Sequence, residues 1–101
     1  MTRNYTESIH VELAKRLYKA GMPIETSADD EWWCPPFAEV FDFLMEKEIG
    51  VSLFSFFDGR QFVWDWSIDT PKYSDSREGY ETFELAATAA IEKALEILNQ
   101  K

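Results

Sequence analysis

Cysteine and histidine are nearly absent from this chain, which has one of each among its 101 residues. A single thiol cannot form a disulfide within the chain, and this composition is typical of a reducing compartment. One histidine and one cysteine are too few for a typical transition-metal site. A nucleophilic pair would need His10 with Cys34 or a serine, and His10 and Cys34 lie in different segments. We therefore expect no catalytic, metal-binding or cofactor-binding residue.

Basic residues and long apolar runs are also scarce. The chain has 10 Lys and Arg against 19 Asp and Glu, a formal net charge of −9. This charge repels phosphate backbones and anionic membrane surfaces, so we expect neither nucleic acid nor a membrane as a partner. No apolar run approaches the roughly 20 residues that span a bilayer. The first residues lack the apolar core of a signal peptide, and the expected location is the cytoplasm.

Glycine is sparse, with four in the chain, and each one falls at a predicted boundary. Gly21 ends a helix, Gly50 precedes a strand, Gly59 belongs to a turn, and Gly79 precedes the last helix. None of them belongs to a phosphate-binding loop. With 46% hydrophobic and 16% aromatic residues, the chain can build one core without disulfides. A single domain over residues 1–101 follows.

Three segments show the apolar periodicity of amphipathic helices. The first runs from about Glu7 to Ala20, and the second from Phe37 to Lys47, directly after Pro35 and Pro36. The third begins at Tyr80 or Thr82 and ends at Asn99. Its apolar stripe consists of Phe83, Ala87, Ile91, Ala94, Leu95 and Leu98.

Between the second and third helices, two segments alternate with the period of β-strands. They cover residues 51–57 and 60–68, and the intervening Asp58-Gly59 is a strong signal for a two-residue hairpin turn. Such a turn places Leu53 opposite Trp64. One sheet face, the expected core face, then carries Val51, Leu53, Phe62, Trp64, Trp66 and Ile68. The other face carries Phe54, Phe56 and Val63, and residues 69–79 are expected to form a polar loop.

The apolar side chains on both faces of the hairpin predict an α+β fold. In it an antiparallel β-hairpin, with or without an extra strand, is covered by helices on both faces in an α/β/α sandwich. The alternative places all helices on one face and buries Phe54, Phe56 and Val63 against a second subunit.

Acidic residues provide the few remaining candidates for chemistry. Asp29-Asp30-Glu31 and the set Asp69, Asp75 and Glu78 lack the spacing of a calcium loop, so solvated charge is expected there. Asp65 lies between two tryptophans on the mixed sheet face, where a raised pKa would suit acid–base chemistry. Pairing with a helix Lys or Arg, or with water, is the expected role of Asp65.

The order of elements resembles a known family. Val11–Pro23 (VELAKRLYKAGMP) resembles the LAKKLKEAGFP opening of small proteins encoded by phages and prophages of gut bacteria. Pro36–Lys47 resembles their proline followed by an EVLDWL-type helix, and Ala89–Leu98 resembles their AAIEKALEIL close. The resemblance implies the helix–sheet–helix arrangement called the phage ABA sandwich. It implies no activity and no catalytic residue.

Three functions of different classes are consistent with these observations. The leading hypothesis is a small acidic phage or prophage protein that acts without catalysis, through contacts with an unidentified protein partner or within a homo-oligomer. The second is an acidic decoy that mimics nucleic acid and inhibits a host defence protein. The third is an enzyme that uses a carboxylate such as Asp65.

Overall fold

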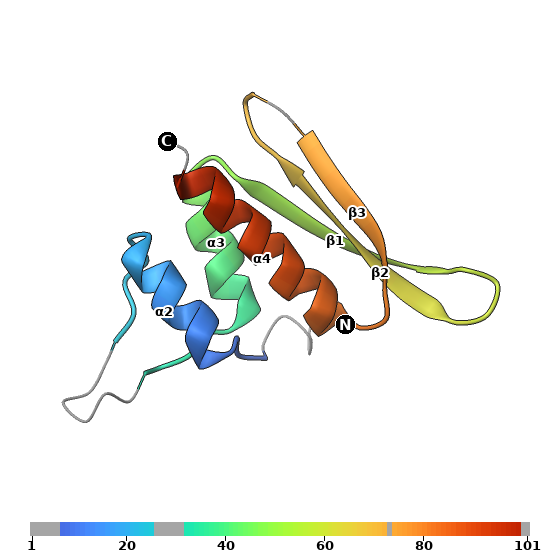
Figure 1. Cartoon of the computed structure of the whole chain (residues 1–101), viewed down its shortest axis with the longest axis horizontal. Helices are drawn as coiled ribbons and strands as arrows, with labels where there is room; N and C mark the ends of the chain where they lie inside the picture. Colours follow the sequence, from blue (N-terminus) through green and yellow to red (C-terminus); the bar gives the residue numbers. More distant parts are fainter. Residues whose placement is uncertain (1–6, 26–31, 73, 100–101) are drawn as a thin grey trace.

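The computed structural model of this chain describes residues 7–25, 32–72 and 74–99. The described residues form three helices and a three-stranded antiparallel sheet, shown in Figure 1, which confirms the predicted α+β class. In chain order the elements are α2 (Val11–Lys19), α3 (Phe37–Glu46), β1 (Gly50–Phe57), β2 (Phe62–Asp69), β3 (Ser74–Tyr80) and α4 (Phe83–Asn99).

The β1–β2 hairpin turns one residue later than predicted. The Asp58 N–H donates to the Gln61 carbonyl at 3.0 Å, so Gly59 and Arg60 form the tip of the turn. Leu53 consequently faces Trp66 and not Trp64. The predicted register is wrong by two residues.

The side chain of Asp58 explains where the turn lies. Its Oδ1 accepts the backbone N–H of Arg60 at 2.8 Å and of Gln61 at 3.0 Å, so the aspartate closes the turn from the position before the tip. Gly59 then takes the left-handed φ of 102° that glycine tolerates. A shift of two residues leaves every side chain on its predicted face, because strand side chains alternate with a period of two.

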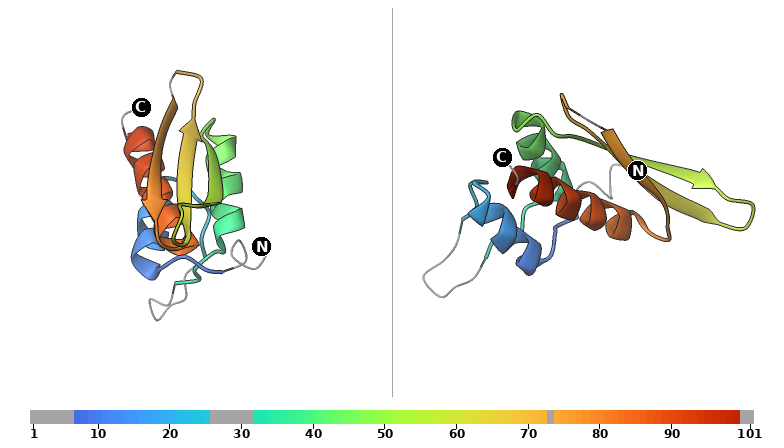
Figure 2. Two further views of the ribbon diagram at one scale, coloured as in Figure 1. Left: turned by 90° about the vertical axis from the view of Figure 1, so that its right-hand side faces the viewer. Right: turned by 45° about the horizontal axis from the view of Figure 1, so that its top comes forward.

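The described helices that contact the sheet all cover one of its faces. Helix α4 contacts all three strands and α3 contacts β1, and both lie on the same side of the sheet (Figures 1 and 2). Helix α2 packs against α4 and lies on the far side of the α3–α4 layer from the sheet (Figure 1). The prediction of helices on both faces is therefore wrong, and the layers run sheet, α3 and α4, then α2.

Helix α4 lies close to the sheet because its buried face is made largely of alanine. Ala86, Ala87, Ala90 and Ala94 are all fully buried. At the start of the helix, the Phe83 ring packs edge-on against two rings, Trp64 of β2 at 5.1 Å and Phe37 of α3 at 5.6 Å. This helix therefore joins the sheet to the other helices.

Two helix boundaries depend on hydrogen bonds that periodicity does not show. Helix α4 starts at Phe83 because Thr82 Oγ1 accepts the N–H of Leu85 at 3.1 Å and caps the helix. Helix α2 starts four residues later than expected. The N–H of Ile9 donates to the Pro35 carbonyl, and the Glu7 carbonyl accepts the N–H of Phe37, each at 3.0 Å. These bonds hold residues 7–9 extended, beside the segment before α3.

Strand β3 lies where a polar loop was expected, so the sheet does contain an extra strand. Its bonds to β2 shift register between Trp64 and Trp66, which face Tyr80 and Arg77. The bulge falls at Gly79, which has a φ of 91°. Backbone bonding to β2 forms this strand, since most of its side chains are exposed.

Trp66 is the side chain of the sheet whose truncation we expect to be most damaging. It is 3% exposed, and its Nε1–H donates to the Tyr80 hydroxyl at 3.2 Å. Trp66→Ala should lower the free energy of unfolding by about 3–5 kcal/mol, as large aromatic truncations do. Phe62→Ala is the control, because Phe62 is 66% exposed and its truncation should cost about 0.5 kcal/mol or less. Urea denaturation measures both, and equal losses would contradict the structure.

The turn should make stability depend on pH through Asp58. Hydrogen bonds from the Gln61 and Arg60 backbone hold the pKa of Asp58 below its ordinary value of 3.8. A lowered folded-state pKa stabilises the fold above pH 3.8, and the contribution disappears as pH falls through the folded value. We expect an NMR titration to give a pKa below 3.8. The stability advantage of the native chain over Asp58→Ala should shrink on acidification. The stability advantage of Asp58→Asn over Asp58→Ala should stay constant, because asparagine does not titrate.

Candidate functional site

The two rare side chains, His10 and Cys34, have separate partners. His10 is exposed, and its Nε2 lies 2.8 Å from Glu84 Oε1 on α4. An ionised carboxylate only accepts, so the imidazole donates this bond. Cys34 is half-buried, and its Sγ lies 3.9 Å from the Trp32 carbonyl oxygen. Neither geometry activates a thiol or a hydroxyl as a nucleophile.

The acidic candidates are likewise held by different groups. Asp69 Oδ1 accepts the Ser74 hydroxyl at 2.6 Å, and Asp75 Oδ2 lies 3.9 Å from Lys93 Nζ. Asp29-Asp30-Glu31 lies outside the described residues. Within the described part of the chain, no group of three or more His, Cys, Asp or Glu side chains is arranged to hold a metal ion.

Asp65 has a structural partner that the sequence did not indicate. Its Oδ1 accepts the backbone N–H of Gly79 at 3.2 Å. The expected partner was a helix Lys or Arg, or water. The carboxylate instead fixes the bulge of β3, and this contact could not be anticipated because β3 itself was not predicted.

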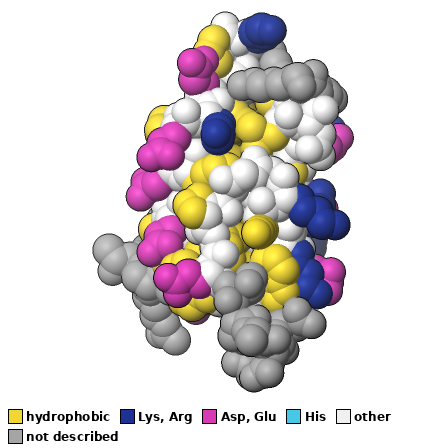
Figure 3. All heavy atoms as spheres, turned by 90° about the vertical axis from the view of Figure 1, so that its left-hand side faces the viewer, with side chains coloured by type: hydrophobic (Ala, Val, Ile, Leu, Met, Phe, Trp, Pro, Cys, Tyr) yellow, Lys and Arg dark blue, Asp and Glu magenta, His cyan; other side chains and the backbone are white. Residues whose placement is uncertain are grey.

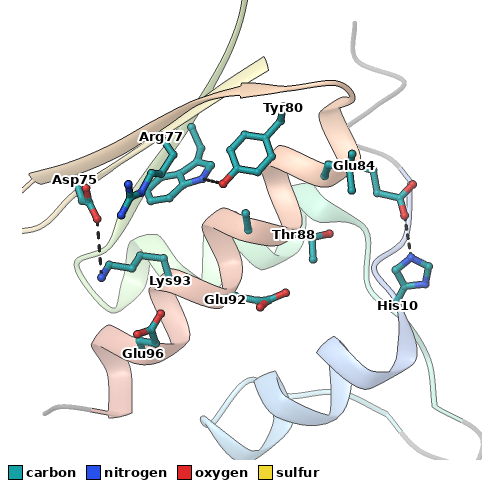
Figure 4. Close-up of a pocket in the computed structure, with 12 residues that line it drawn as sticks. His10, Asp75, Arg77, Tyr80, Glu84, Thr88, Glu92, Lys93 and Glu96 are labelled. Carbon is teal, nitrogen blue, oxygen red and sulfur yellow. Dashed lines mark hydrogen bonds and ion pairs between the residues drawn. The ribbon is translucent and has the colours of Figure 1, made fainter. Parts of the chain in front are cut away.

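A groove of about 630 Å³ lies between β3 and α4. Figure 4 shows Asp75, Arg77 and Tyr80 of β3 facing the side chains of α4 across it. Its lining residues from α4 are Glu84, Leu85, Thr88, Ala89, Glu92, Lys93 and Glu96. The missing β3 in the predicted fold explains why sequence reasoning did not find this groove.

Three of the acidic residues along this groove share one face of α4. Glu84, Glu92 and Glu96 are separated by multiples of four residues, which places them in line on a helix. Two of the three have a basic partner from the N-terminal part of the chain. His10 lies beside Glu84, and Arg16 Nη1 lies 4.0 Å from Glu92 Oε2. The groove is thus a mixed-charge surface.

Both signs of charge are also present on the end of the molecule that Figure 3 presents. Asp and Glu side chains gather along one margin of this face, with Lys and Arg side chains toward the other margin and the upper end. Hydrophobic side chains show between them. This face carries both signs of charge.

The tip half of the β1–β2 hairpin is the largest exposed apolar feature of the sheet. It projects beyond the helices in Figures 1 and 2. Four phenylalanines expose large fractions of their surface there: Phe54 52%, Phe56 39%, Phe57 58% and Phe62 66%. We call these four residues the hairpin patch, which wraps around the hairpin: Phe57 and Phe62 lie on the helix face beyond the start of α4, and Phe54 and Phe56 lie on the opposite face. Phe57 and Phe62 contact each other, with ring centroids 5.4 Å apart.

The exposure of Phe62 corrects the prediction that it belongs to the core. Helix α4 begins with Phe83, which lies against Trp64, so the hairpin extends past the first turn of the helix. The alternation of side chains assigned Phe62 to the correct sheet face. It does not indicate how far along the strand the helices cover that face. Trp64 is accordingly only partly buried, whereas Trp66 and Ile68 are buried.

Comparison with protein-family models, with curated proteins and with solved structures finds no match to this chain. None of the helices in the described residues is both long and apolar enough to cross a membrane. The hairpin patch, with its four exposed phenylalanine rings, is the candidate functional site.

We expect His10 and Cys34 to contribute little to stability. The His10–Glu84 pair is exposed, with side-chain exposures of 76% and 48%, and exposed pairs contribute about 0–1 kcal/mol. His10→Gln and Cys34→Ser should each change the free energy of unfolding by less than about 1 kcal/mol, measured by urea denaturation. They should also leave any binding activity within a few-fold of the native chain. A tenfold loss of binding in either variant, with the fold intact, would indicate a chemical role for the residue that was replaced.

Proposed function

We propose that this chain is a non-enzymatic protein-interaction module and that the hairpin patch is its contact surface. The observation that carries the proposal is the exposure of four phenylalanines on a hairpin that projects from the helical layer. Burial of a large apolar side chain contributes about 1.5–3 kcal/mol. A protein partner that covers these rings gains this free energy.

The chemistry of the patch favours a protein over other ligands. Residues 50–57 carry no charged side chain, whereas aromatic platforms for nucleic acid lie in positively charged grooves. Small-molecule sites are concave, and this hairpin projects outward (Figure 2). An apolar surface of this shape suits a protein chain.

The acidic decoy has one supporting observation, the line of Glu84, Glu92 and Glu96 on α4. A nucleic-acid mimic needs an uninterrupted row of negative charge. Here His10 and Lys93 line the same groove, and Arg16 pairs with Glu92. The decoy is therefore the weaker of the two proposals.

The resemblance to phage and prophage proteins adds a proposed genomic setting to this function. The helix motifs that carry it include Val11–Pro23 and Ala89–Leu98. Neighbouring tail, replication or anti-defence genes would support this setting, and a neighbourhood of housekeeping genes would oppose it.

Photo-crosslinking in cells tests the proposed contact surface. A photoreactive phenylalanine analogue at Phe56 should give a covalent adduct with protein on irradiation, because Phe56 lies in the hairpin patch. The matched control carries the same analogue at Leu85, which is 54% exposed on α4. We expect at least fivefold more adduct from position 56, measured by blotting and mass spectrometry.

Two results would refute the proposal. One is no adduct from position 56 in the folded variant. The other is equal adduct from both positions, since equal yields would mean random encounters and not a specific surface. Circular dichroism checks that both variants fold.

A further inference from the structure

The two edges of the sheet differ in how they are protected against pairing. Edge strands are commonly blocked by charged side chains or bulges. Strand β3 has both, with Asp75, Arg77 and Glu78 in its sequence and a bulge at Gly79. Strand β1 is the other edge, and its eight residues Gly50–Phe57 contain no charge and pair with β2 without a bulge. The β1 edge is therefore open to pairing.

The hydrogen bond at the turn shows which β1 backbone groups point outward. Asp58 and Gln61 form a hydrogen-bonded pair, and opposed residues of an antiparallel ladder alternate between bonded and non-bonded pairs. Counting back along the register, Leu53, Ser55 and Phe57 occupy non-bonded positions toward β2. Their N–H and C=O groups face away from β2, toward the open edge.

We infer that the open β1 edge, which carries Phe54, Phe56 and Phe57 of the hairpin patch, pairs with the β1 edge of a second copy of this chain, antiparallel and about a two-fold axis at Ser55. This inference rests on the proposed function of the patch as a protein-binding surface. With Ser55 opposite Ser55 of the second copy, Leu53 bonds with Phe57 of the second copy, and the reverse. The result is one continuous antiparallel sheet across both copies.

This register is self-complementary in its side chains. On the outer face, Phe54 of each copy lies opposite Phe56 of the other, which gives two aromatic cross-strand pairs. On the helix face, Leu53 lies opposite Phe57, with two small serines at the axis. No charge lies in the paired residues 53–57, so neither copy brings a carboxylate into the contact.

The area available matches a weak dimer. Phe62 lies on β2, outside the paired edge, so the three phenylalanines of β1 supply the apolar contact. They expose roughly 300 Å² in each copy, from their exposed fractions and about 200 Å² for a whole aromatic side chain. Both copies together provide at most roughly 600 Å², to which the paired backbone adds, and stable specific interfaces begin at about 1,200 Å². We therefore expect a dimer that dissociates on dilution.

Sedimentation equilibrium of the purified chain tests the dimer. We expect a concentration-dependent mass that approaches twice 11.8 kDa. Ser55→Pro removes an outward N–H that β2 does not use, and proline is tolerated at such edge positions. It should weaken the dimer at least tenfold. Ser55→Ala keeps the N–H at the same position and should stay within threefold of the native chain.

A charge-swap pair tests the register independently of proline. Ser55→Lys and Ser55→Glu should each be monomeric, because like charges meet at the axis. An equimolar mixture of the two should form a mixed dimer, detected by native mass spectrometry. Circular dichroism confirms that each variant folds.

Three results would overturn the inference: a native chain that is monomeric up to about millimolar concentration, a dimer unaffected by Ser55→Pro, or a charge-swap mixture that stays monomeric. A monomeric chain that still crosslinks to another protein from Phe56 would overturn the dimer and leave the proposed function standing. A chain that dimerises in solution but gives no crosslink from position 56 would refute both the proposed contact surface and the inferred register, because Phe56 lies at the paired edge.

Discussion

The close approach of α4 to the central strand β2 is the contact on which the rest of this structure depends. Four fully buried alanines let the helix lie near the sheet, and α4 is the element that contacts all three strands and α2. Phe83 at its start packs between Trp64 of the sheet and Phe37 of α3. Substitutions that enlarge this alanine face would push the helix away from all three strands at once, because overpacking moves whole elements.

The placement of all helices on one side explains the uneven polarity of the uncovered sheet face. Near the base of the hairpin this face carries Ser52 and its cross-strand partner Ser67, which faces Ser76 of β3. Toward the tip it carries Phe54 and Phe56. Serine side chains are readily hydrated, so the base of the hairpin can face solvent. The exposed apolar side chains of this face lie toward the tip. The prediction of a second helical layer rested on the apolar residues of this mixed face, and no described helix covers them.

Much of the fold followed from periodicity in the sequence, since helical stripes and strand alternation are properties of local burial. The faces of β1 and β2 survived an error in the turn because a one-residue shift of the turn moves the register by two. Strand β3 could not be predicted, because its sequence Ser-Asp-Ser-Arg-Glu-Gly-Tyr lacks the β-branched residues that mark strands. Backbone hydrogen bonds to β2 hold it in place, and such bonds do not produce a periodic pattern of apolar residues in the sequence.

The candidate site was harder to predict than the core for a related reason. The aromatic residues of the hairpin were all visible in the sequence, but their exposure depends on where α4 begins. That point is set by the Thr82 cap and by the contact of Phe83 with Trp64. The groove beside β3 and the role of Asp65 both required a strand that the sequence did not reveal.

The asymmetry of the two sheet edges also limits how large any assembly built on this sheet can grow. A sheet with two open edges adds copies without end and forms a fibre, whereas a two-fold contact uses the same edge on both copies and closes. The bulge at Gly79, fixed by Asp65, and the charges of β3 lie on the other edge of the sheet that the described residues form. Pairing through the uncharged β1 edge would therefore end at two copies, because the bulge and charges of β3 block the edge at which a third copy would add.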